Sequence, residues 1–511
     1  MTHGRSKGIR LKARLRLLKR AEALARIFRA HEYILLISLA VLVGVVGGLG
    51  SILFGWLIGL SNNLFFVQFW GFLKENVPYG TYLIPIVPIL GGAVVGPLVY
   101  FGAREAKGHG VPEVMTAVAV RGGVIRARVA LVKILASAIC IGSGGSAGRE
   151  GPIVQIGSTL GSALGQWLHL STNRIKLLVG CGAAAGIAGT FNAPIAGALF
   201  AFEVILGSFS AEYFAPVIIS SVVGAAISRA YFGNYPAITV THYTLNSPWE
   251  LGLYALMGIL VGVGAVLFIK SLYGAEDLFE KVKLPEPLKP ALGGALLGAA
   301  AIFFPQILGV GYEAMDLAFS AKLGIGLMAV LFAMKILGTS VTLGSGGSGG
   351  VFAPSLFIGS MFGGAFGGIA NKLLPNIAAT PTAYALVGMG AMVAGTTRAP
   401  ITAIIIVFEM TDNYTIILPL MVAAVFGTVV SRILSPRTIY TEKIARKGII
   451  LEQGRDVGVL DSLYVKDVMR RDYERIPAHM RFGQFLKFLQ NARQSCFPVL
   501  DRTGMLAGVL P

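Results

Sequence analysis

The sequence predicts an all-α polytopic membrane protein built as an inverted repeat of broken and tilted helices, followed by a short α/β segment. Composition is the first reason: 55% of the 511 residues are hydrophobic and only 13% are charged, whereas about 25% of a typical soluble domain is charged. Apolar runs of spanning length are the second reason. The third is a glycine-rich stretch that lies between apolar runs and occurs twice.

The apolar runs give the expected spans. Five charge-poor runs are long enough to cross a bilayer: Ile34–Leu60, Thr81–Phe101, Leu177–Phe202, Leu251–Ile269 and Ala383–Phe408. Shorter runs such as Pro290–Phe304 are expected to be tilted, broken or re-entrant, so the number of spans does not follow from the sequence.

The net charge of +18 is concentrated before the first span. The first 31 residues hold ten Lys or Arg and a single acid, Glu22. Positive charge beside a first span is typical of a cytoplasmic N-terminus, and leucines at helical spacing predict an arm along the membrane surface. No basic patch with interleaved aromatic residues accompanies it, so we expect no nucleic-acid binding.

A duplication joins the two halves of the chain. Lys133–Ser158 and Lys335–Ser360 are identical at 13 of 26 positions without a gap, at an offset of 202 residues. A second pair, Gly189–Glu203 and Gly395–Glu409, follows at an offset of 206 residues. Glycine-interrupted apolar segments at matching positions of two halves point to a transport site where the repeats meet, near the bilayer midplane.

The first copy, Gly142–Ser158, has the chemistry of an anion site. Glycines let an ion approach bare N–H groups, and Pro152 opens a helix whose N-terminus favours negative charge. Irregular backbone at membrane depth is tolerated where it lines a cavity. The alternative is that small residues merely allow close helix packing, but that would not require Glu150 in one loop and Phe352 in the other.

Other chemistries lack their residues. Three scattered cysteines and six unclustered histidines make no metal spacing or disulfide framework. No Walker lysine follows the glycine-rich loops, and no nucleophile–base pair is recognisable. We therefore expect no catalytic residues, no metal, no cofactor and no enzyme activity.

Four regions are expected: a cytoplasmic basic N-terminal helix at 1–31, membrane repeats at 32–250 and 251–450, and a linker with a soluble segment at 451–511. From Thr438 to Leu451 the chain is amphipathic. Beyond Asp461 the pattern predicts a helix, an FPVLD strand and a DRTG turn.

Together these motifs resemble the CLC family of chloride channels and chloride/proton antiporters, over about residues 32–450. Gly108–Pro112 is similar to the family motif GSGIP, Gly148–Pro152 matches GREGP, and Gly350–Pro354 matches GxFxP. Tyr440 falls where the family keeps an anion-binding tyrosine. The segment after 451 resembles the first part of a CBS-domain pair, so we expect a partial CBS domain.

The resemblance implies roles for single residues. The anion would be bound by this set: His109, Gly110, Gly148, Arg149, Glu150, Gly151, Val351, Phe352 and Tyr440. Glu150 would also be the gate, with its carboxylate in an anion site when charged and displaced when protonated. Two alternatives remain open: Glu150 as a structural N-terminal carboxylate, and Arg149 as a partner of a nearby acid or carbonyl. Gly108–Pro112 alone would also suit an ordinary capped helix start.

Two departures from the family pattern bear on function. His109 replaces the central serine, so anion preference does not carry over. Glu203 stands at the first position of the family's acidic pair, but Val204 replaces the second, which in antiporters takes up protons internally. We therefore favour passive, channel-like chloride conduction, with chloride/proton antiport by another internal route as the alternative. A nucleotide-sensing or enzymatic membrane protein is the remote alternative.

The resemblance also implies partners and location. We expect chloride or a similar small anion, protons, membrane lipid and a second copy of the chain in a homodimer. A nucleotide would bind only at a complete CBS pair. The protein is expected in the plasma (inner) membrane as a multi-pass protein with both termini in the cytoplasm.

Overall fold

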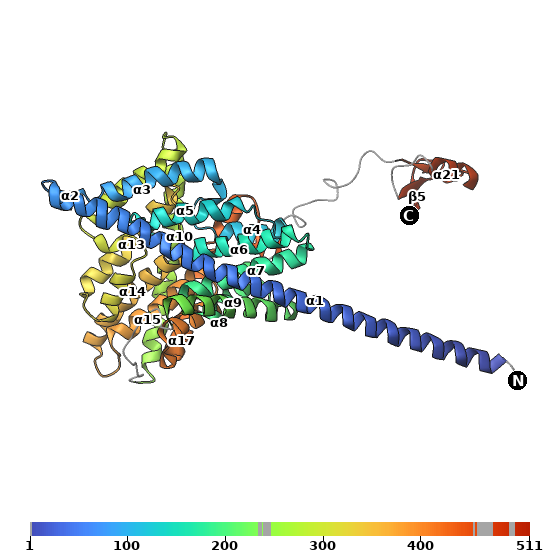
Figure 1. Cartoon of the computed structure of the whole chain (residues 1–511), viewed down its shortest axis with the longest axis horizontal. Helices are drawn as coiled ribbons and strands as arrows, with labels where there is room; N and C mark the ends of the chain where they lie inside the picture. Colours follow the sequence, from blue (N-terminus) through green and yellow to red (C-terminus); the bar gives the residue numbers. More distant parts are fainter. Residues whose placement is uncertain are drawn as a thin grey trace. The chain divides into compact units, whose positions relative to one another are not determined.

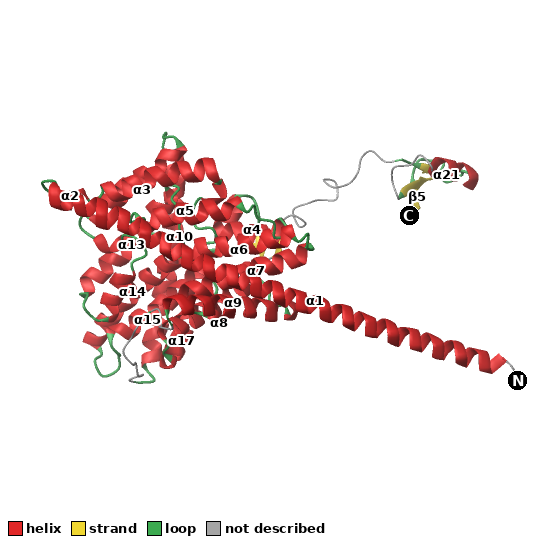
Figure 2. Cartoon of the chain, viewed as in Figure 1, coloured by secondary structure: helices red, strands yellow, loops and turns green. Residues whose placement is uncertain are grey.

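The computed structural model describes residues 3–233, 238, 247–452, 455–456, 474–489 and 496–510, with side chains from residue 33 onward. The chain divides into two compact units, Met1–Asp456 and Val457–Pro511. The first unit is almost entirely helical, as the red ribbons of Figure 2 show. Most of the expected loop Ala237–Trp249 lies outside the described residues.

The helices of the first unit fall into two series, one in each half of the chain (Figure 1). The first series is α1 His3–Asn62, α2 Gly71–Asn76, α3 Ile86–Pro97, α4 Val111–Val120, α5 Arg128–Gly142, α6 Glu150–Trp167, α7 Thr172–Phe191, α8 Pro194–Phe200 and α9 Ala211–Phe232. The second is α10 Glu250–Lys281, α11 Lys289–Ala301, α12 Tyr312–Phe319, α13 Ile325–Gly344, α14 Phe352–Leu373, α15 Pro381–Thr397, α16 Pro400–Thr411, α17 Ile417–Leu434 and α18 Thr441–Arg446.

Short irregular helices join or extend these elements. The π-helical segments are Asn63–Trp70, Leu98–Gly102 and Ala201–Leu206, and the 3-10 turns are Gly80–Leu83, Arg104–Ala106, Glu286–Leu288, Pro305–Ile307 and Tyr414–Ile416. A two-residue ladder of β1 (Leu451–Glu452) and β2 (Arg455–Asp456) ends the unit. The helix α1 runs through positions 31 and 32 without a break, so the expected boundary there is not marked by a change of structure.

Seven described helices are long and apolar enough to cross a membrane. Three of the five expected spans are not single spanning helices. Thr81–Phe101 starts with a 3-10 turn, and its helix begins only at Ile86. The other two are broken in the middle. Leu177–Phe202 is interrupted where Asn192 takes a left-handed conformation at the end of α7, and Ala383–Phe408 is interrupted in the same way at Arg398 after α15. The physical reason is the proline two residues later, which disfavours helical geometry in the residue before it and starts a new helix.

Glycines set the packing within each half. A Cβ on Gly157 of α6 would lie 2.2 Å from the carbonyl oxygen of Gly182 in α7. The same contact recurs between α14 and α15, where a Cβ on Gly359 would lie 2.3 Å from the carbonyl oxygen of Gly388. Backbones this close leave no room for a side chain, so both helix pairs depend on glycine. The matching contacts confirm the duplication in the fold.

The second unit is a small α/β structure. Strand β3 (Ile476–Pro477) pairs in parallel with β4 (Phe497–Leu500), which pairs antiparallel with β5 (Leu506–Leu510). Helix α21 (Phe482–Leu489) packs Phe485 against the sheet. The predicted FPVLD strand and DRTG turn are both present. In that turn Thr503 donates to the Asp501 carboxylate, and this hydrogen bond lowers the pKa of Asp501.

Candidate functional site

The two duplicated glycine loops pair with each other directly. The amide of Gly148 donates to the carbonyl oxygen of Gly350 at 2.8 Å, and the amide of Gly350 donates to that of Gly148 at 2.5 Å, as an antiparallel bridge. A Cβ on Gly350 would lie 2.7 Å from the amide nitrogen of Gly151. Segments 202 residues apart in the sequence therefore meet at one buried point.

The pairing corrects one detail of the predicted site. The Gly148 amide was expected to be free for an anion, but it is engaged by the Gly350 carbonyl. The next residues begin helices: α6 starts at Glu150 and α14 at Phe352. The first amides of a helix have no carbonyl partner within that helix, and they carry the positive end of its dipole. These amides, which include those of Gly151 and Ala353, are the donors that the paired loops offer.

The loop before α4 joins the same cluster. Gly108 donates from its amide to the Gly347 carbonyl at 3.0 Å and accepts from the Gly349 amide at 3.3 Å. Behind the loop, the buried Lys133 ammonium donates to the carbonyls of Ala106 and Gly108 at 3.0 and 2.7 Å. The loops that carry the three motifs are thus held together by backbone hydrogen bonds.

Glu150 crosses from one half of the molecule to the other. Its side chain is 1% exposed, and one carboxylate oxygen accepts from the Ala353 amide in the first turn of α14 at 3.1 Å. The other oxygen accepts from the Tyr312 hydroxyl at 3.3 Å. A negative group from the first half therefore occupies a helix N-terminus of the second half, a position that favours anions.

Arg149 lies beside Glu150 but turns to other partners. Its guanidinium donates to the Thr190 carbonyl at 3.2 Å and lies 5.2 Å from the centre of the Tyr312 ring. Both arginines of this region, Arg149 and Arg229, line a cavity of about 350 Å³ that also reaches Tyr312. Since the Tyr312 hydroxyl contacts Glu150, this cavity reaches a residue that touches the predicted gate.

His109 and Tyr440 form the other side of the cluster. Their ring centres lie 5.9 Å apart, and both side chains are 2% exposed. A Cβ on Gly151 would lie 2.2 Å from the His109 carbonyl oxygen, so His109 adjoins the start of α6. The His109 Nε2 atom is 3.2 Å from the hydroxyl of Tyr273 in α10. The structure thus brings residues of all three glycine motifs and Tyr440 into one region.

Glu203 is bound elsewhere. Its carboxylate accepts from the Thr402 amide at 2.8 Å and the Thr402 hydroxyl at 2.7 Å, at the N-terminus of α16. Glu409 does the same for α8, because it accepts from the amides of Ile195 and Ala196 at 3.0 and 2.7 Å. The two carboxylates therefore cap each other's helices across the repeat. Val204 is a buried apolar side chain.

Sequence reasoning missed Tyr312 and Lys335. The Lys335 ammonium donates to the carbonyls of Ile307 and Gly309 at 3.0 and 2.8 Å, which mirrors Lys133 in the other half. The signal was present: Gly309–Glu313, GVGYE, stands 201 residues after Gly108–Pro112, GHGVP. Only the two glycines of this pair are identical, too few to be recognised without the structure.

Comparisons with known proteins agree with this arrangement. The sequence model described as voltage gated chloride channel matches residues 91–432. A Ralstonia nicotianae protein named for its likeness to the chloride channel protein ClcB is 35% identical over 423 residues, which cover 80% of this chain and 97% of that protein. The Vibrio cholerae H+/Cl− exchange transporter ClcA is 35% identical over 356 residues, which cover 68% of this chain and 76% of that protein.

A solved structure extends the likeness to the fold. The X-ray crystal structure of a slow cyanobacterial Cl−/H+ antiporter matches with a TM-score of 0.76 at 28% identity, over 81% of this chain and 97% of that one. The match to the family model stops before the C-terminal segment, so the partial CBS domain stays a prediction. The chain is a multi-pass membrane protein that belongs to the voltage-gated chloride channel family, the CLC family of chloride transport proteins.

Proposed function

We propose that this protein carries chloride or a similar small anion across its membrane through a pathway gated by Glu150. One observation carries the proposal: the Glu150 carboxylate rests on the Ala353 amide at the start of α14, where an anion would be stabilised by the same donor and dipole. When the carboxylate is protonated it loses the charge that holds it there, and an anion can replace it.

Passive conduction is the first mode we propose. Antiport requires an internal group that carries protons toward Glu150, and Val204 has no such group. Glu203 supports this view, because its carboxylate accepts hydrogen bonds from the Thr402 amide and hydroxyl. These hydrogen bonds give the Glu203 carboxylate a structural role at the start of α16.

Exchange of chloride for protons is the second candidate. Its support comes from relatives, since the similar proteins include an H+/Cl− exchange transporter and a Cl−/H+ antiporter. The two modes differ in one measurement: chloride and proton movement recorded together in proteoliposomes with a chloride gradient. Steady uphill proton movement would exclude passive conduction. A reversal potential at the chloride Nernst value, unmoved by a pH gradient, would exclude exchange.

The gate itself is tested by Glu150→Gln. The amide mimics the protonated carboxyl and cannot become charged. At saturating chloride, where occupancy of the site does not depend on pH, we expect anion flux at neutral pH to rise to its acid-pH level and to lose its pH dependence. Flux assays across about pH 5 to 8 measure this. If the flux of the variant had the same pH dependence as that of the unaltered protein, Glu150 would not be the gate.

The proposal extends to assembly and orientation. We propose a homodimer with one pathway in each subunit, cytoplasmic termini in a plasma membrane, and no enzymatic reaction. Cross-linking in native membranes and protease access to either end from each side measure these points separately from transport.

A further inference from the structure

The buried imidazole of His109 has one nitrogen without a partner. Its Nε2 atom contacts the Tyr273 hydroxyl at 3.2 Å, whereas Nδ1 has no hydrogen-bond partner among the described residues. A buried polar atom without a partner is rare in native proteins and calls for an explanation. A ligand that the imidazole holds during function would provide one.

The hydrogen-bond network decides which nitrogen carries the proton. The Tyr273 hydroxyl donates its single hydrogen to the Ile439 carbonyl at 2.5 Å. It can therefore only accept from His109, so the neutral imidazole has its hydrogen on Nε2 and a bare lone pair on Nδ1. The neutral ring would repel an anion at Nδ1 and attract a proton.

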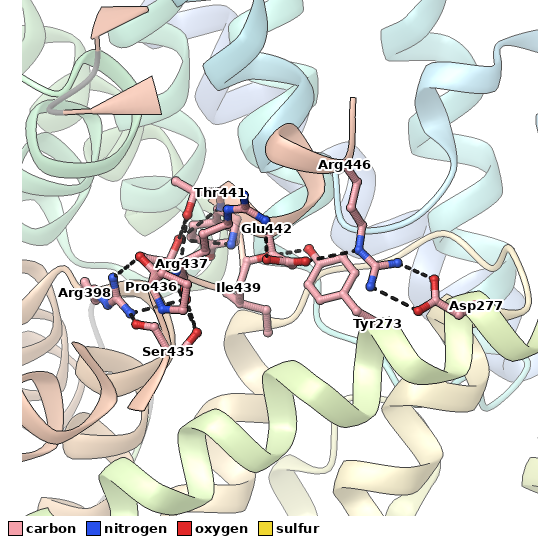
Figure 3. A network of polar contacts seen from close by, with 12 residues as sticks. Tyr273, Asp277, Arg398, Ser435, Pro436, Arg437, Ile439, Thr441, Glu442 and Arg446 are labelled. Atoms are coloured by element: carbon pink, nitrogen blue, oxygen red, sulfur yellow. Dashed lines mark hydrogen bonds and ion pairs between the residues drawn. The ribbon is translucent and has the colours of Figure 1, made fainter. Parts of the chain in front are cut away.

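Tyr273 is held firmly in this arrangement. Figure 3 shows its hydroxyl directed at Ile439 and Arg446 packed against its ring, with the guanidinium 4.8 Å from the ring centre. Arg446 is fixed in turn by Asp277 at 2.5 Å and by Glu442 at 3.3 Å. Because the hydroxyl cannot readily turn toward His109 as a donor, the Nε2–H form of His109 is imposed on it.

Charged groups approach His109 from several elements. Lys443 of α18 and Lys447, the residue directly after α18, face it. Each has an acidic partner: Lys443 pairs with Glu276 of α10 at 3.7 Å, and Lys447 pairs with Glu113 of α4. These acids compensate the two lysines locally, so neither lysine is a free counter-charge for an anion.

Lys133 of α5 also faces His109, and its described partners are the carbonyls of Ala106 and Gly108. Tyr440 contributes an uncharged ring beside the imidazole. A proton added to Nδ1 alone would place a new cation among these lysines, which is electrostatically unfavourable. A proton that arrives together with an anion would not.

We infer that His109 takes up a proton on Nδ1 when an anion binds, so that anion and proton bind to this site cooperatively. The proton comes from solvent and the imidazolium donates Nδ1–H to the anion, as a charge-assisted hydrogen bond. The serine that the family resemblance places here would donate a hydroxyl without any uptake. This inference rests on the proposed function, because it assigns a proton to the same anion pathway.

The experiment measures protons taken up per chloride bound, in detergent-solubilised Glu150→Gln protein. This background removes the gate carboxylate, so its protonation cannot contribute. We expect about one proton to be taken up per chloride bound. Because the coupling is reciprocal, the affinity for chloride should rise about tenfold for each unit fall in pH, over the pH range in which His109 is neutral in the chloride-free protein. Calorimetry in buffers of different ionisation enthalpy gives both quantities.

Matched variants locate the uptake. In the same background His109→Ser and His109→Gln retain a donor but cannot titrate, so chloride should bind without proton uptake. The exposed His169→Ser should keep the uptake. Tyr273→Phe removes the acceptor that fixes Nε2–H, which lets neutral His109 carry its hydrogen on Nδ1. Chloride should then bind with less than half of the proton uptake, a change that a merely structural histidine would not produce.

Two results would overturn the inference. Proton uptake that is unchanged in both His109 variants would assign the proton to another group. Chloride binding without any proton uptake in the Glu150→Gln protein would show that the site does not couple the two ions. Absence of chloride binding from the unaltered protein and from every variant would overturn the proposed function as well, so the two failures are distinguishable.

Discussion

The second half of the chain holds the carboxylate of Glu150 with two hydrogen bonds. One comes from the Ala353 amide at 3.1 Å and the other from the Tyr312 hydroxyl at 3.3 Å. The amide belongs to the helix and would serve an anion equally well. The hydroxyl is the contact that a side-chain substitution can remove, so the balance between carboxylate and anion can be shifted at Tyr312.

We expect Tyr312→Phe to favour the anion. Loss of a long hydrogen bond to a charged group costs about 1 kcal/mol, which corresponds to about a fivefold rise in anion occupancy. The rise should be seen at about pH 7.5, where the carboxylate is charged, and should vanish at acid pH, where it is displaced already. Chloride flux measures it, with the exposed Tyr414→Phe as the control. If the variant and the unaltered protein had the same chloride flux at about pH 7.5 as well as at acid pH, the Tyr312 contact would have no role in holding the carboxylate.

Single residues were predictable where a motif carried them. Gly148–Pro152 and Gly350–Pro354 identified the loops that meet, because glycine and proline impose a turn followed by a helix. The hydrogen bond that occupies the Gly148 amide was not predictable, since it depends on how two distant loops face each other. Tyr312 was missed because its loop shares only two glycines with its counterpart.

At the level of helices, the crossed caps are the contacts that tie α8 to α16. Glu203 closes the N-terminus of α16, and Glu409 closes that of α8. The hydrogen bonds of Glu203 indicate a structural role for its carboxylate, which is to cap α16. The family resemblance placed Glu203 only at the first position of the acidic pair, whose proton-carrying second position is Val204 here.

Glu203→Gln and Glu409→Gln should therefore act alike. Each variant loses a charged acceptor at a helix N-terminus, so each should lower the free energy of unfolding by about 1 to 2 kcal/mol. Thermal unfolding in detergent measures this, and anion flux per folded protein should stay within about twofold of the unaltered protein. A selective loss of proton movement in Glu203→Gln alone would return it to a transport role.

Helix boundaries were the weakest part of the prediction. Hydropathy gave Leu177–Phe202 and Ala383–Phe408 as single spans because their side chains are apolar throughout. The breaks are changes of backbone conformation at Asn192 and Arg398, each followed by a non-helical alanine and a proline. A window average does not register them, although the proline in each run was visible.

Across the whole molecule, the two halves reuse one device. A buried lysine from the helix before each glycine loop donates to two carbonyls of a second loop, Lys133 at Ala106 and Gly108, and Lys335 at Ile307 and Gly309. The fold class and the duplication were predicted correctly, since they depend on composition and on sequence identity. The use of lysine as a carbonyl clamp was not.

We expect Lys133→Met and Lys335→Met to destabilise the protein equally. Each removes two hydrogen bonds that a buried ammonium donates to backbone carbonyls, at a cost of about 2 to 4 kcal/mol in the free energy of unfolding. Thermal unfolding tests this, with the exposed Lys322→Met as the control. Losses that differ by more than about 2 kcal/mol between the halves would show that the symmetry of the contacts does not extend to their energies.

The antiparallel bridge between Gly148 and Gly350 has an implication for ancestry. Each half supplies one side of this ladder and one helix end, so a single copy has nothing to pair with. A protein with one copy could form this bridge only by pairing two separate polypeptides. In the duplicated chain both copies lie in one polypeptide, so the two sides of the bridge can differ in sequence: the first carries Glu150 and the second carries Phe352 at the matching position.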